Sequence, residues 1–435
     1  MDFSDYLTSK LQGMREDADA ANEHPLADIH THIDNFLNQV KQGLLNNPEP
    51  VFALLRRFKP ILLVKNYALI TRFEDVQEVL NRDGVFQQLY GKKMAQVNQG
   101  MNYILGMENS PDYTRDKSNL WQTMPRQEIP GRIVPLIETA ARDVLAAANG
   151  ELDITLDLFQ GVQLQLIREY FGITIPDRHT FFATLLDISR YIFGDWGDDP
   201  QNQERALAAG KVFNHILLDS IASAKQNPNP NPNPATILGR FIKMQQDGVA
   251  GCDDETIRAN LFGTILGAIT APSVTFTCAL DFLIERPNDW QLLHQVALAN
   301  DDATIRRYIY EAYRFKPMTP GWFRHCAEDY IVAKGTARAT MIPADTITIA
   351  LTQSAMMDDA MLDQPDEFKL NRPDYHYMVY ASGIHECMGK YISDTMMTLA
   401  LKALMQQTNV QRVEGAAGQI QMQGGFPNGF RVRFG

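Results

Sequence analysis

The chain has 435 residues, 45% of them hydrophobic and 21% charged, which is the composition of a globular protein able to bury a large core. Its formal net charge of −12 at pH 7 argues against a nucleic acid as a partner. Because the four cysteines show neither a CxxC pair nor zinc-finger spacing, we expect no disulfide framework or zinc site, and a reducing compartment such as the cytoplasm is favoured.

The first part of the chain changes from polar to amphipathic. Residues 1–26 form a polar N-terminal extension with no apolar run, so they predict neither a signal peptide nor a membrane anchor. Residues 27–58 are expected to be helical. Two short apolar runs within residues 61–72 predict a β-hairpin, and helical spacing resumes at Phe73. Residues 84–106, rich in Gly, Gln and Asn, are predicted to be irregular.

Helical patterns dominate residues 130–225, and a run of alternating Asn and Pro follows over residues 227–234. Alternating proline excludes both a helix and a central strand. The run therefore predicts either a boundary between independent domains or an exposed loop between two helices.

Residues 259–280 carry no charged side chain and are long enough to span a membrane. Their many hydroxyl and amide side chains make them poor bilayer material, so a helix crossing the middle of a large soluble protein fits better, and no membrane contact is expected. Pro272 has no N–H and clashes with the carbonyl of Ala268. We therefore expect a kink that frees the Ala268 oxygen.

Glu311 and Arg314 lie three residues apart in a helical stretch, and so on one helix face. Taken alone, such a pair is usually a solvated surface ion pair. Apolar runs between residues 322 and 349 alternate with polar ones and predict several short strands. The fold class expected from these patterns is mainly α with a small β region.

Near the C-terminus the chain reads Tyr380-Ala-Ser-Gly-Ile-His-Glu-Cys-Met-Gly-Lys390, a glycine-punctuated loop before an apolar-periodic helix. Gly383 can adopt turn conformations closed to other residues, and Gly389 leaves room for a flat cofactor. A helix beginning near Met388 would direct its N–H groups and positive dipole end at Cys387 and favour a thiolate metal ligand. The alternative is a buried free cysteine at a loop–helix junction.

This loop resembles the heme-binding loop of the cytochrome P-450 family, written F-x-x-G-x-H-x-C-x-G. The matching residues are Tyr380 in place of Phe, then Gly383, His385, Cys387 and Gly389. The resemblance implies that Cys387 is the proximal ligand of the iron in heme b, iron protoporphyrin IX.

The resemblance extends, in order, over about residues 50–435. It implies a cytochrome P-450 fold in a single domain over residues 1–435, with a heme-thiolate loop at residues 376–390. Since the resemblance lies on both sides of residues 227–234, we favour an exposed loop there over a domain boundary.

The resemblance also implies which residues support the heme. Glu311 and Arg314 match the family's E-x-x-R pair, which locks onto a later arginine, here Arg372, and we interpret all three as structural. Residues expected to contact a heme propionate match by chemical kind or position: Arg324, His385, Tyr113 and Lys117, with Trp121 and Arg126 as further candidates.

The chain departs from the family on the central helix, where the family's A-G-x-(Asp/Glu)-Thr is replaced by Gly267-Ala-Ile-Thr-Ala-Pro272. Thr270 takes the acid position and Ala271 the alcohol position, so the usual proton relay is lost. One hypothesis is a weakened proton path through Thr270 and a water held by the freed carbonyl of Ala268. A second is that the enzyme starts from a peroxide, and a third is that Thr270 and Pro272 only shape the helix.

The resemblance implies a heme-thiolate oxidoreductase that inserts one oxygen atom into a small hydrophobic substrate, by hydroxylation or epoxidation, with dioxygen and external electrons. It implies a ferredoxin- or flavodoxin-type donor with its reductase, and a cytoplasmic monomer. A peroxide-driven peroxygenase or fatty-acid hydroperoxide isomerase, and a non-catalytic heme-binding sensor, are alternatives. The expected pocket-lining residues are Phe182, Phe193, Trp196, Met101 and Ile104.

Overall fold

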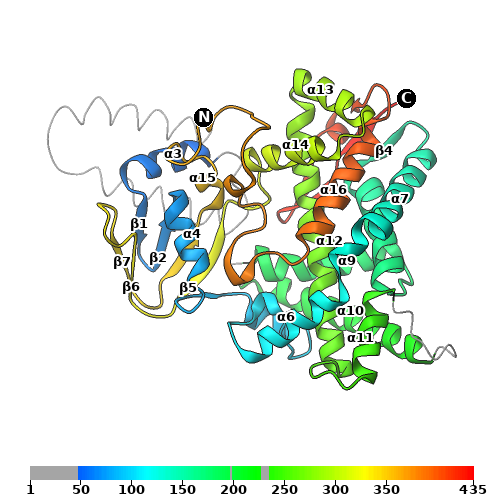
Figure 1. Ribbon diagram of the computed structural model, residues 1–435, viewed down its shortest axis with the longest axis horizontal. Helices are drawn as coiled ribbons and strands as arrows, with labels where there is room; N and C mark the ends of the chain where they lie inside the picture. The colour runs from blue at the N-terminus through cyan, green and yellow to red at the C-terminus, as the bar shows by residue number, and fades with distance from the viewer. Residues whose placement is uncertain (1–47, 196–197, 227–234) are drawn as a thin grey trace. The chain divides into compact units, whose positions relative to one another are not determined.

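The structure is a computed structural model that describes residues 48–195, 198–226 and 235–435 (Figure 1). The polar extension, residues 27–47 of the expected first helix, Trp196 and the Asn-Pro run lie outside the described residues. The described residues form two compact units, and the expectation of a single domain stays a prediction. Unit 1 comprises residues 48–89, 319–368 and 373–384, and unit 2 comprises the other described residues.

Unit 1 is built on a five-stranded sheet of order β1-β2-β8-β5-β3. The predicted hairpin is confirmed, since β1 and β2 pair antiparallel from Ile61↔Ile70 to Val64↔Tyr67, and β2 then pairs with β8 in parallel. A second hairpin joins β6 and β7. The strands are β1 (Ile61–Val64), β2 (Tyr67–Ile70), β3 (Phe86–Gln88), β5 (Trp322–Cys326), β6 (Tyr330–Val332), β7 (Thr340–Ile342) and β8 (Ile347–Ala350).

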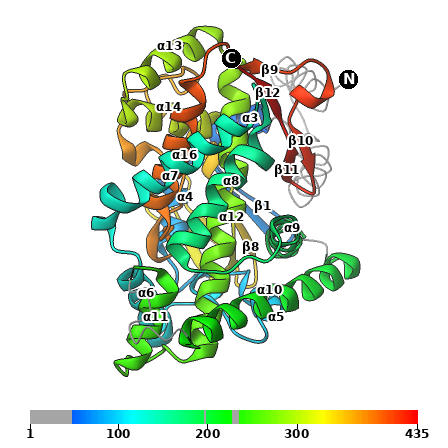
Figure 2. The ribbon, with the colours of Figure 1, turned by 90° about the vertical axis from the view of Figure 1, so that its right-hand side faces the viewer.

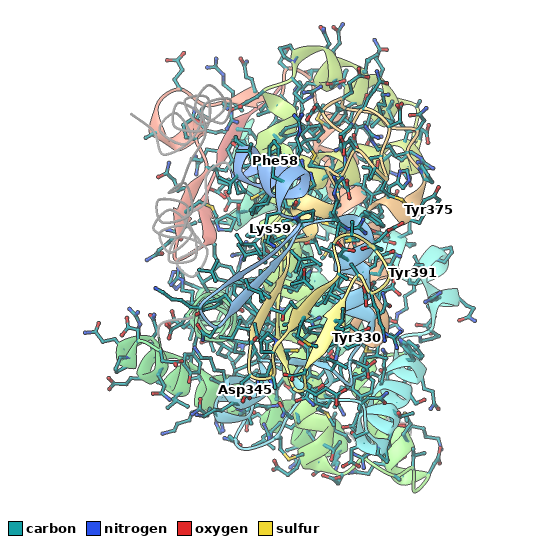
Figure 3. All side chains as sticks on the ribbon, turned by 90° about the vertical axis from the view of Figure 1, so that its left-hand side faces the viewer. Phe58, Lys59, Tyr330, Asp345, Tyr375 and Tyr391 are labelled. Atoms are coloured by element: carbon teal, nitrogen blue, oxygen red, sulfur yellow. The ribbon has the colours of Figure 1, made fainter. Side chains whose placement is uncertain are left out.

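The helices of unit 1 are α3 (Glu49–Phe58), α4 (Phe73–Asn81), α15 (Thr352–Ala355) and the short η7 (Asp374–His376). Figure 3 shows exposed aromatic rings on this unit, among them Phe58 at the end of α3, which is 69% exposed.

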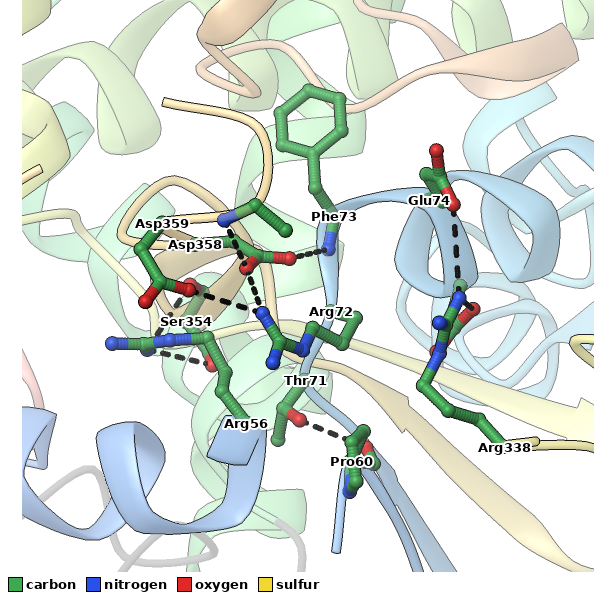
Figure 4. A network of polar contacts seen from close by, with 12 residues as sticks. Arg56, Pro60, Thr71, Arg72, Phe73, Glu74, Arg338, Ser354, Asp358 and Asp359 are labelled. Carbon is green, nitrogen blue, oxygen red and sulfur yellow. Dashed lines mark hydrogen bonds and ion pairs between the residues drawn. The ribbon is translucent and has the colours of Figure 1, made fainter. Parts of the chain in front are cut away.

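A polar network joins the helices of unit 1 to distant parts of its chain (Figure 4). Arg56 donates to the carbonyl and the hydroxyl of Ser354, at 3.1 and 3.0 Å. Asp358 accepts from the backbone N–H of Phe73 at 3.0 Å and from the guanidinium of Arg72. Since both carboxylate oxygens and the start of α4 are engaged, this buried acid is fully compensated.

Unit 2 is mainly helical. Its α-helices are α5 (Gly91–Val97), α6 (Pro111–Thr123), α7 (Val134–Ala147), α8 (Gln160–Gln165), α9 (Arg178–Ser189), α10 (Pro200–Gln226), α11 (Ile237–Gln246), α12 (Asp254–Ile284), α13 (Pro287–Leu298), α14 (Asp302–Phe315) and α16 (Lys390–Met405). Short 3-10 or π turns are η1 (Ile104–Gly106), η2 (Arg126–Glu128), η3 (Ile129–Ile133), η4 (Ile154–Phe159), η5 (Leu166–Phe171), η6 (Arg190–Gly194) and η9 (Ala416–Gly418).

Two small sheets complete unit 2. One has the order β4-β12-β9 and the other pairs β10 with β11. Their strands are β4 (Glu151–Asp153), β9 (Gln411–Arg412), β10 (Gln421–Gln423), β11 (Phe426–Gly429) and β12 (Arg431–Arg433). The predicted class, mainly α with a small β region, is confirmed by the two units together.

The prediction that residues 84–106 are irregular is wrong, because they contain β3, α5 and η1. β3 forms through pairing with a partner far along the chain, Phe86↔Cys326. α5 and η1 meet at Gly91 and Gly106, where a Cβ on either residue would strike the backbone of the other. Both causes are tertiary contacts and leave no local pattern.

α12 runs through the middle of unit 2 (Figure 2). Among the described residues it is the one helix long and apolar enough to cross a membrane, but 78% of its apolar window is buried within the protein. The expected interior helix is thus confirmed. Asp253 caps it by accepting the N–H of Thr256 at 3.0 Å, and Pro272 lies inside it.

The predicted structural triad of unit 2 is confirmed. Arg314 donates twice to Glu311, at 3.0 and 2.7 Å, and Arg372 donates to the same carboxylate at 3.2 Å. Glu311 and Arg314 are fully buried, so this is not a surface ion pair. The backbone N–H of Lys369 donates a further hydrogen bond, at 2.9 Å. A fully buried carboxylate with several donors holds the segment around Arg372 against α14.

Candidate heme site

The cysteine loop has the local geometry that its glycines predict. Gly383 has φ +78°, and a Cβ there would strike the carbonyl of Leu80, so a side chain is excluded twice. α16 begins at Lys390 with Gly389 as its N-cap, close to the predicted start. A Cβ on Gly389 would meet Cys387 Sγ at an ordinary 3.7 Å. The chain itself therefore tolerates a side chain at Gly389, and the need for room there stays a prediction about the cofactor.

Cys387 is exposed, whereas the other three cysteines are buried. The protein around its thiol nevertheless displaces enough water to raise the pKa of Cys387 to about 11, although the backbone N–H groups of Gly389 and Lys390 act in the opposite direction. The prediction that the helix and the loop favour a thiolate concerns Cys387 as a metal ligand, and it stays a prediction. A thiol that is both accessible and poorly hydrated would lose its proton on binding a metal ion.

Two predicted side chains of α6, Tyr113 and Lys117, lie together with His385 of the cysteine loop. The rings of Tyr113 and His385 meet edge to face, with centroids 5.5 Å apart. Lys117 donates to the phenol oxygen of Tyr113 at 2.8 Å, and burial lowers the pKa of Lys117. A partly desolvated ammonium beside a phenol and an imidazole is suited to a carboxylate. Contact of these residues with a propionate stays a prediction.

The other candidates lie elsewhere on the two units. Trp121 is 55% exposed beside Lys117, and Arg126 stacks on the ring of Tyr391 at 3.6 Å (Figure 3). Arg324 belongs to β5 of unit 1, where it is 3% exposed and donates to the carbonyl of Phe323 at 2.8 Å. Its proposed contact with a propionate stays a prediction.

One face of α12 is accessible although most of the helix is buried. It is made of Thr264, Gly267, Ala268 and Ala271, whose spacing of three and four residues places them in one stripe. A Cβ added at Gly267 would have nothing within 4 Å. We call these four residues the open face. It is small and uncharged, and space lies beside it.

Thr270 does not belong to the open face. It is 7% exposed, and its hydroxyl donates to the carbonyl of Leu266 at 3.0 Å. Its only proton is therefore committed to the helix backbone. The hypothesis of a proton path through Thr270 is not supported by this position.

The carbonyl of Ala268, which Pro272 leaves without its helical N–H donor, also has a hydrogen-bond donor within the protein. Gln163 of α8, which is fully buried, donates through its side-chain amide to Ala268 O at 3.1 Å and to Ile269 O at 2.7 Å. The hydroxyl of Ser273 lies 3.1 Å from the amide oxygen of Gln163 and 2.7 Å from Ile269 O, and it can donate to one of them at a time. A protein amide therefore already donates to the carbonyl to which one hypothesis assigns a water, and that hypothesis stays a prediction. Sequence analysis missed Gln163, because α8 also contains Gln160 and Gln165 and nothing in the sequence distinguishes the three.

The expected pocket residues have varied surroundings. Phe182 packs on Phe181, and Phe193 packs on Tyr90, so both make aromatic core contacts. Met101 is partly accessible and Ile104 is buried. Their role in lining a pocket stays a prediction. Sequence analysis passed over their neighbour Tyr103, whose ring packs directly on Gly263 of α12, at a point where a Cβ would overlap it.

Tyr103 links the open face to the cysteine loop. Burial raises the pKa of Tyr103 above its usual range, and the charges of Cys387 and Tyr113 act on it in the same direction. Such influence requires that Tyr103, Cys387 and Tyr113 lie near one another. α12, the cysteine loop and α6 therefore border one region of unit 2.

The donor set of this region fits heme. Among the described residues there is no group of three His, Cys, Asp or Glu side chains that could hold a metal ion. Heme brings its own nitrogen ligands, so one protein sulfur, that of Cys387, would be enough to hold its iron. The glycine-lined open face and the Tyr113–Lys117–His385 cluster are suited to a flat cofactor with carboxylate groups. Together the helical fold and this site define a heme-thiolate protein.

The comparison with known proteins agrees with that class. The family model described as cytochrome P-450 matches residues 36–426, and the chain belongs to the cytochrome P-450 family. Its cofactor is heme b, and it is a heme monooxygenase of this family.

The sequence is similar to curated oxygenases from actinobacteria. It is 21% identical to "Nocardicin C N-oxygenase" of Nocardia uniformis subsp. tsuyamanensis, over 82% of this chain and 87% of that protein. It is 22% identical to "Cyclomarin C epoxidase CymV" of Salinispora arenicola, over 66% and 68%. The crystal structure of P450BioI with a fatty-acid-ligated acyl carrier protein covers 91% of this chain and all of that one, with a TM-score of 0.76 and 16% identity, which shows the fold alone.

Proposed function

We propose that the protein inserts one oxygen atom from dioxygen into a small hydrophobic substrate, by hydroxylation or epoxidation, with Cys387 as the thiolate ligand of the heme iron. Bound heme supplies the activation of oxygen, and a thiolate ligand favours cleavage of the O–O bond. The observation that carries the proposal is the pairing of one accessible cysteine with the uncharged open face of α12. Two relatives are named as an N-oxygenase and an epoxidase, and these names support the same kind of reaction.

The residues of the chain divide the work. The thiolate of Cys387 accepts hydrogen bonds from the N–H groups of Gly389 and Lys390, which disperse its charge. Lys117, Tyr113 and His385 would hold a propionate, and Arg324 of unit 1 is a separate candidate for the same role. Gly267, Ala268 and Ala271 of the open face contribute shape alone, and Thr264 is its one polar residue.

Electrons would come from a ferredoxin- or flavodoxin-type protein with its reductase, and the protein would work as a soluble cytoplasmic monomer. A structural neighbour was solved with an acyl chain on a carrier protein, so acyl substrates belong in any substrate panel.

A peroxide-driven reaction is a second candidate. Its support is that the open face carries no carboxyl group and that Thr270 directs its hydroxyl to Leu266 O. Ala271, in the usual alcohol position, cannot relay a proton. A peroxide or hydroperoxide already contains the electrons and protons that dioxygen lacks, so the missing relay would matter little to a peroxygenase or a hydroperoxide isomerase.

Purified heme-loaded protein with either a reduced ferredoxin system or hydrogen peroxide, against terpenes, steroids, fatty acids and aromatics, tests both candidates. We expect product with the electron donor, and product with peroxide alone would establish the second candidate. Tight heme without product under either regime would instead favour a sensor.

The ligand assignment has its own test. Cys387→Ala should abolish the thiolate-type carbon monoxide spectrum, whereas Cys326→Ala, which removes a buried thiol of unit 1, should keep it. Retention of that spectrum in Cys387→Ala would contradict the whole site.

A further inference from the structure

The N-terminal end of the open face is polar. Thr264 lies one helical turn before Ala268, and its hydroxyl oxygen is 3.2 Å from the phenol oxygen of Tyr103. Tyr103 is 9% exposed and is held in place by the close packing of its ring on Gly263. The phenol group of Tyr103 therefore points in a fixed direction, toward Thr264 on the open face.

The phenol of Tyr103 can donate its proton either to the oxygen of Thr264, 3.2 Å away, or to the oxygen of a ligand. The hydroxyl of Thr264 also lies 2.7 Å from the carbonyl of Asn260, and its one proton cannot serve both partners. The backbone carbonyl is nearer and is the usual acceptor for a helical threonine. Burial raises the pKa of Tyr103, so the phenol stays protonated and keeps an O–H to donate.

Asn260 adds a second donor on the same face. It lies one turn before Thr264 and two turns before Ala268. The residue is 2% exposed, and its side-chain nitrogen has no hydrogen-bond partner among the described residues. A buried N–H group without an acceptor has lost its hydrogen bonds to water and has none to the protein in their place. A ligand that places an oxygen beside it would therefore bind favourably.

We propose that Tyr103, Thr264 and Asn260 form a subsite for a neutral carbonyl oxygen of the substrate, in a ketone, ester or amide. The inference rests on the proposed function, because it assigns the substrate class of that same site. Arg258, the cation of α12 nearest to Asn260, is already engaged by Glu255, Asn98 and Asn214, so a charged acid is not the expected ligand.

The helix also sets a distance. Four residues separate Thr264 from Ala268 and eight separate Asn260 from Ala268, which at the rise of an α-helix is about 6 Å and about 12 Å along its axis. A ligand whose carbonyl is held by this subsite would therefore extend along the open face toward Ala268 and Ala271.

The test is a spectral titration of heme-loaded protein with matched ligands. Each set contains a carbonyl compound, its hydrocarbon and its carboxylate: a cyclic ketone against the cycloalkane, and a methyl ester against the alkane and the free fatty acid. We expect wild-type protein to bind the carbonyl member about tenfold more tightly than the hydrocarbon, the effect of one or two buried hydrogen bonds. The carboxylate should gain no such advantage.

Variants then locate the subsite. In Tyr103→Phe and in Asn260→Leu the ratio of the two dissociation constants should fall to within about twofold of one. Tyr313→Phe is the matched control, since it removes another buried phenol oxygen that has no partner among the described residues, and it should keep the tenfold ratio. A ratio lost in only one variant supports the proposal with that residue as the main donor.

Three results would overturn the inference: no preference for the carbonyl member in wild-type protein, an unchanged ratio in both variants, or tighter binding of the carboxylate. The carbon monoxide spectrum and turnover of any hydrocarbon report on the proposed function separately. If those hold while the carbonyl preference is absent, only the subsite falls. If they fail, the heme-thiolate assignment falls with it.

Discussion

The contact between Gln163 and the kinked part of α12 leads to a sharp stability prediction. Pro272 leaves the carbonyl of Ala268 without its helical N–H donor, and the amide of Gln163 replaces that donor at 3.1 Å. Gln163→Leu would keep the volume of the fully buried side chain and remove the replacement. The two substitutions Gln163→Leu and Pro272→Ala should therefore be strongly coupled.

The expected size follows from the bonds lost. A buried acceptor left unsatisfied costs about 1–3 kcal/mol, and Ala268 O would be such an acceptor. Ile269 O keeps the hydroxyl of Ser273 at 2.7 Å, so its loss is smaller. We expect Gln163→Leu to lower the free energy of unfolding by about 2 kcal/mol. With alanine at position 272, a backbone N–H returns to Ala268 O, and the same change should cost about 1 kcal/mol or less.

The assay is a double-mutant cycle on heme-loaded protein, in which urea unfolding is followed by circular dichroism. Gln165→Leu is the control, because this residue lies on the same helix but has no contact with Ala268 or Ile269 among the described residues. Coupling of about 1 kcal/mol is expected for Gln163 and Pro272, and none for Gln165 and Pro272. Additivity within about 0.5 kcal/mol for the first pair would refute the view that Gln163 compensates for the proline.

Three further predictions concern other parts of unit 2. Gly267→Ala should raise the stability of α12 by about 1 kcal/mol, because alanine is the better helix former and its Cβ meets no protein atom. The same Cβ enters the open space, so substrate-induced spectral shifts should weaken. Unchanged shifts in a stabilised variant would contradict this prediction. Glu311→Gln should lower the free energy of unfolding by about 3–5 kcal/mol, since two buried guanidinium groups would lose their anion. It should also reduce the heme content, measured by the Soret-to-280 nm absorbance ratio. Full heme content in this variant would show that the triad is dispensable. Burial lowers the pKa of Lys117 from 10.5, so between the lowered pKa and 10.5 the unfolded state binds more protons and the free energy of unfolding should rise with pH. Lys117→Met should flatten this rise, measured as the urea midpoint against pH. An identical slope in the variant would contradict the assignment.

Patterns within a short segment predicted their structures well. The hairpin of residues 61–72 was expected from short apolar runs and the helix around Pro272 from a long uncharged run, and both are local properties. The left-handed conformation of Gly383 was expected from the residue type alone. The partnership of Glu311 with Arg372 was expected from a family resemblance and not from spacing.

The misses all concern contacts between segments far apart in the chain. One of three hypotheses gave Thr270 a place in a proton path, but its side chain is buried and its hydroxyl donates to Leu266 O. The freed carbonyl of Ala268 was expected to be open, but Gln163 reaches it from a position 105 residues away. Neither the rotation of a helix that is apolar on all sides nor the partner of a freed carbonyl has a sequence period to reveal it.

The sequence by itself determined the family, the cofactor and the cysteine that is the candidate ligand, because a glycine-punctuated loop before a helix is a local arrangement with few uses. Only the tertiary structure decided which residues of α12 are accessible and what borders them. Accessibility depends on the packing of α8, Tyr103 and the cysteine loop around that helix, and each of these comes from a different part of the chain. The open face, with its polar end at Asn260 and Thr264, exists only once those segments have met.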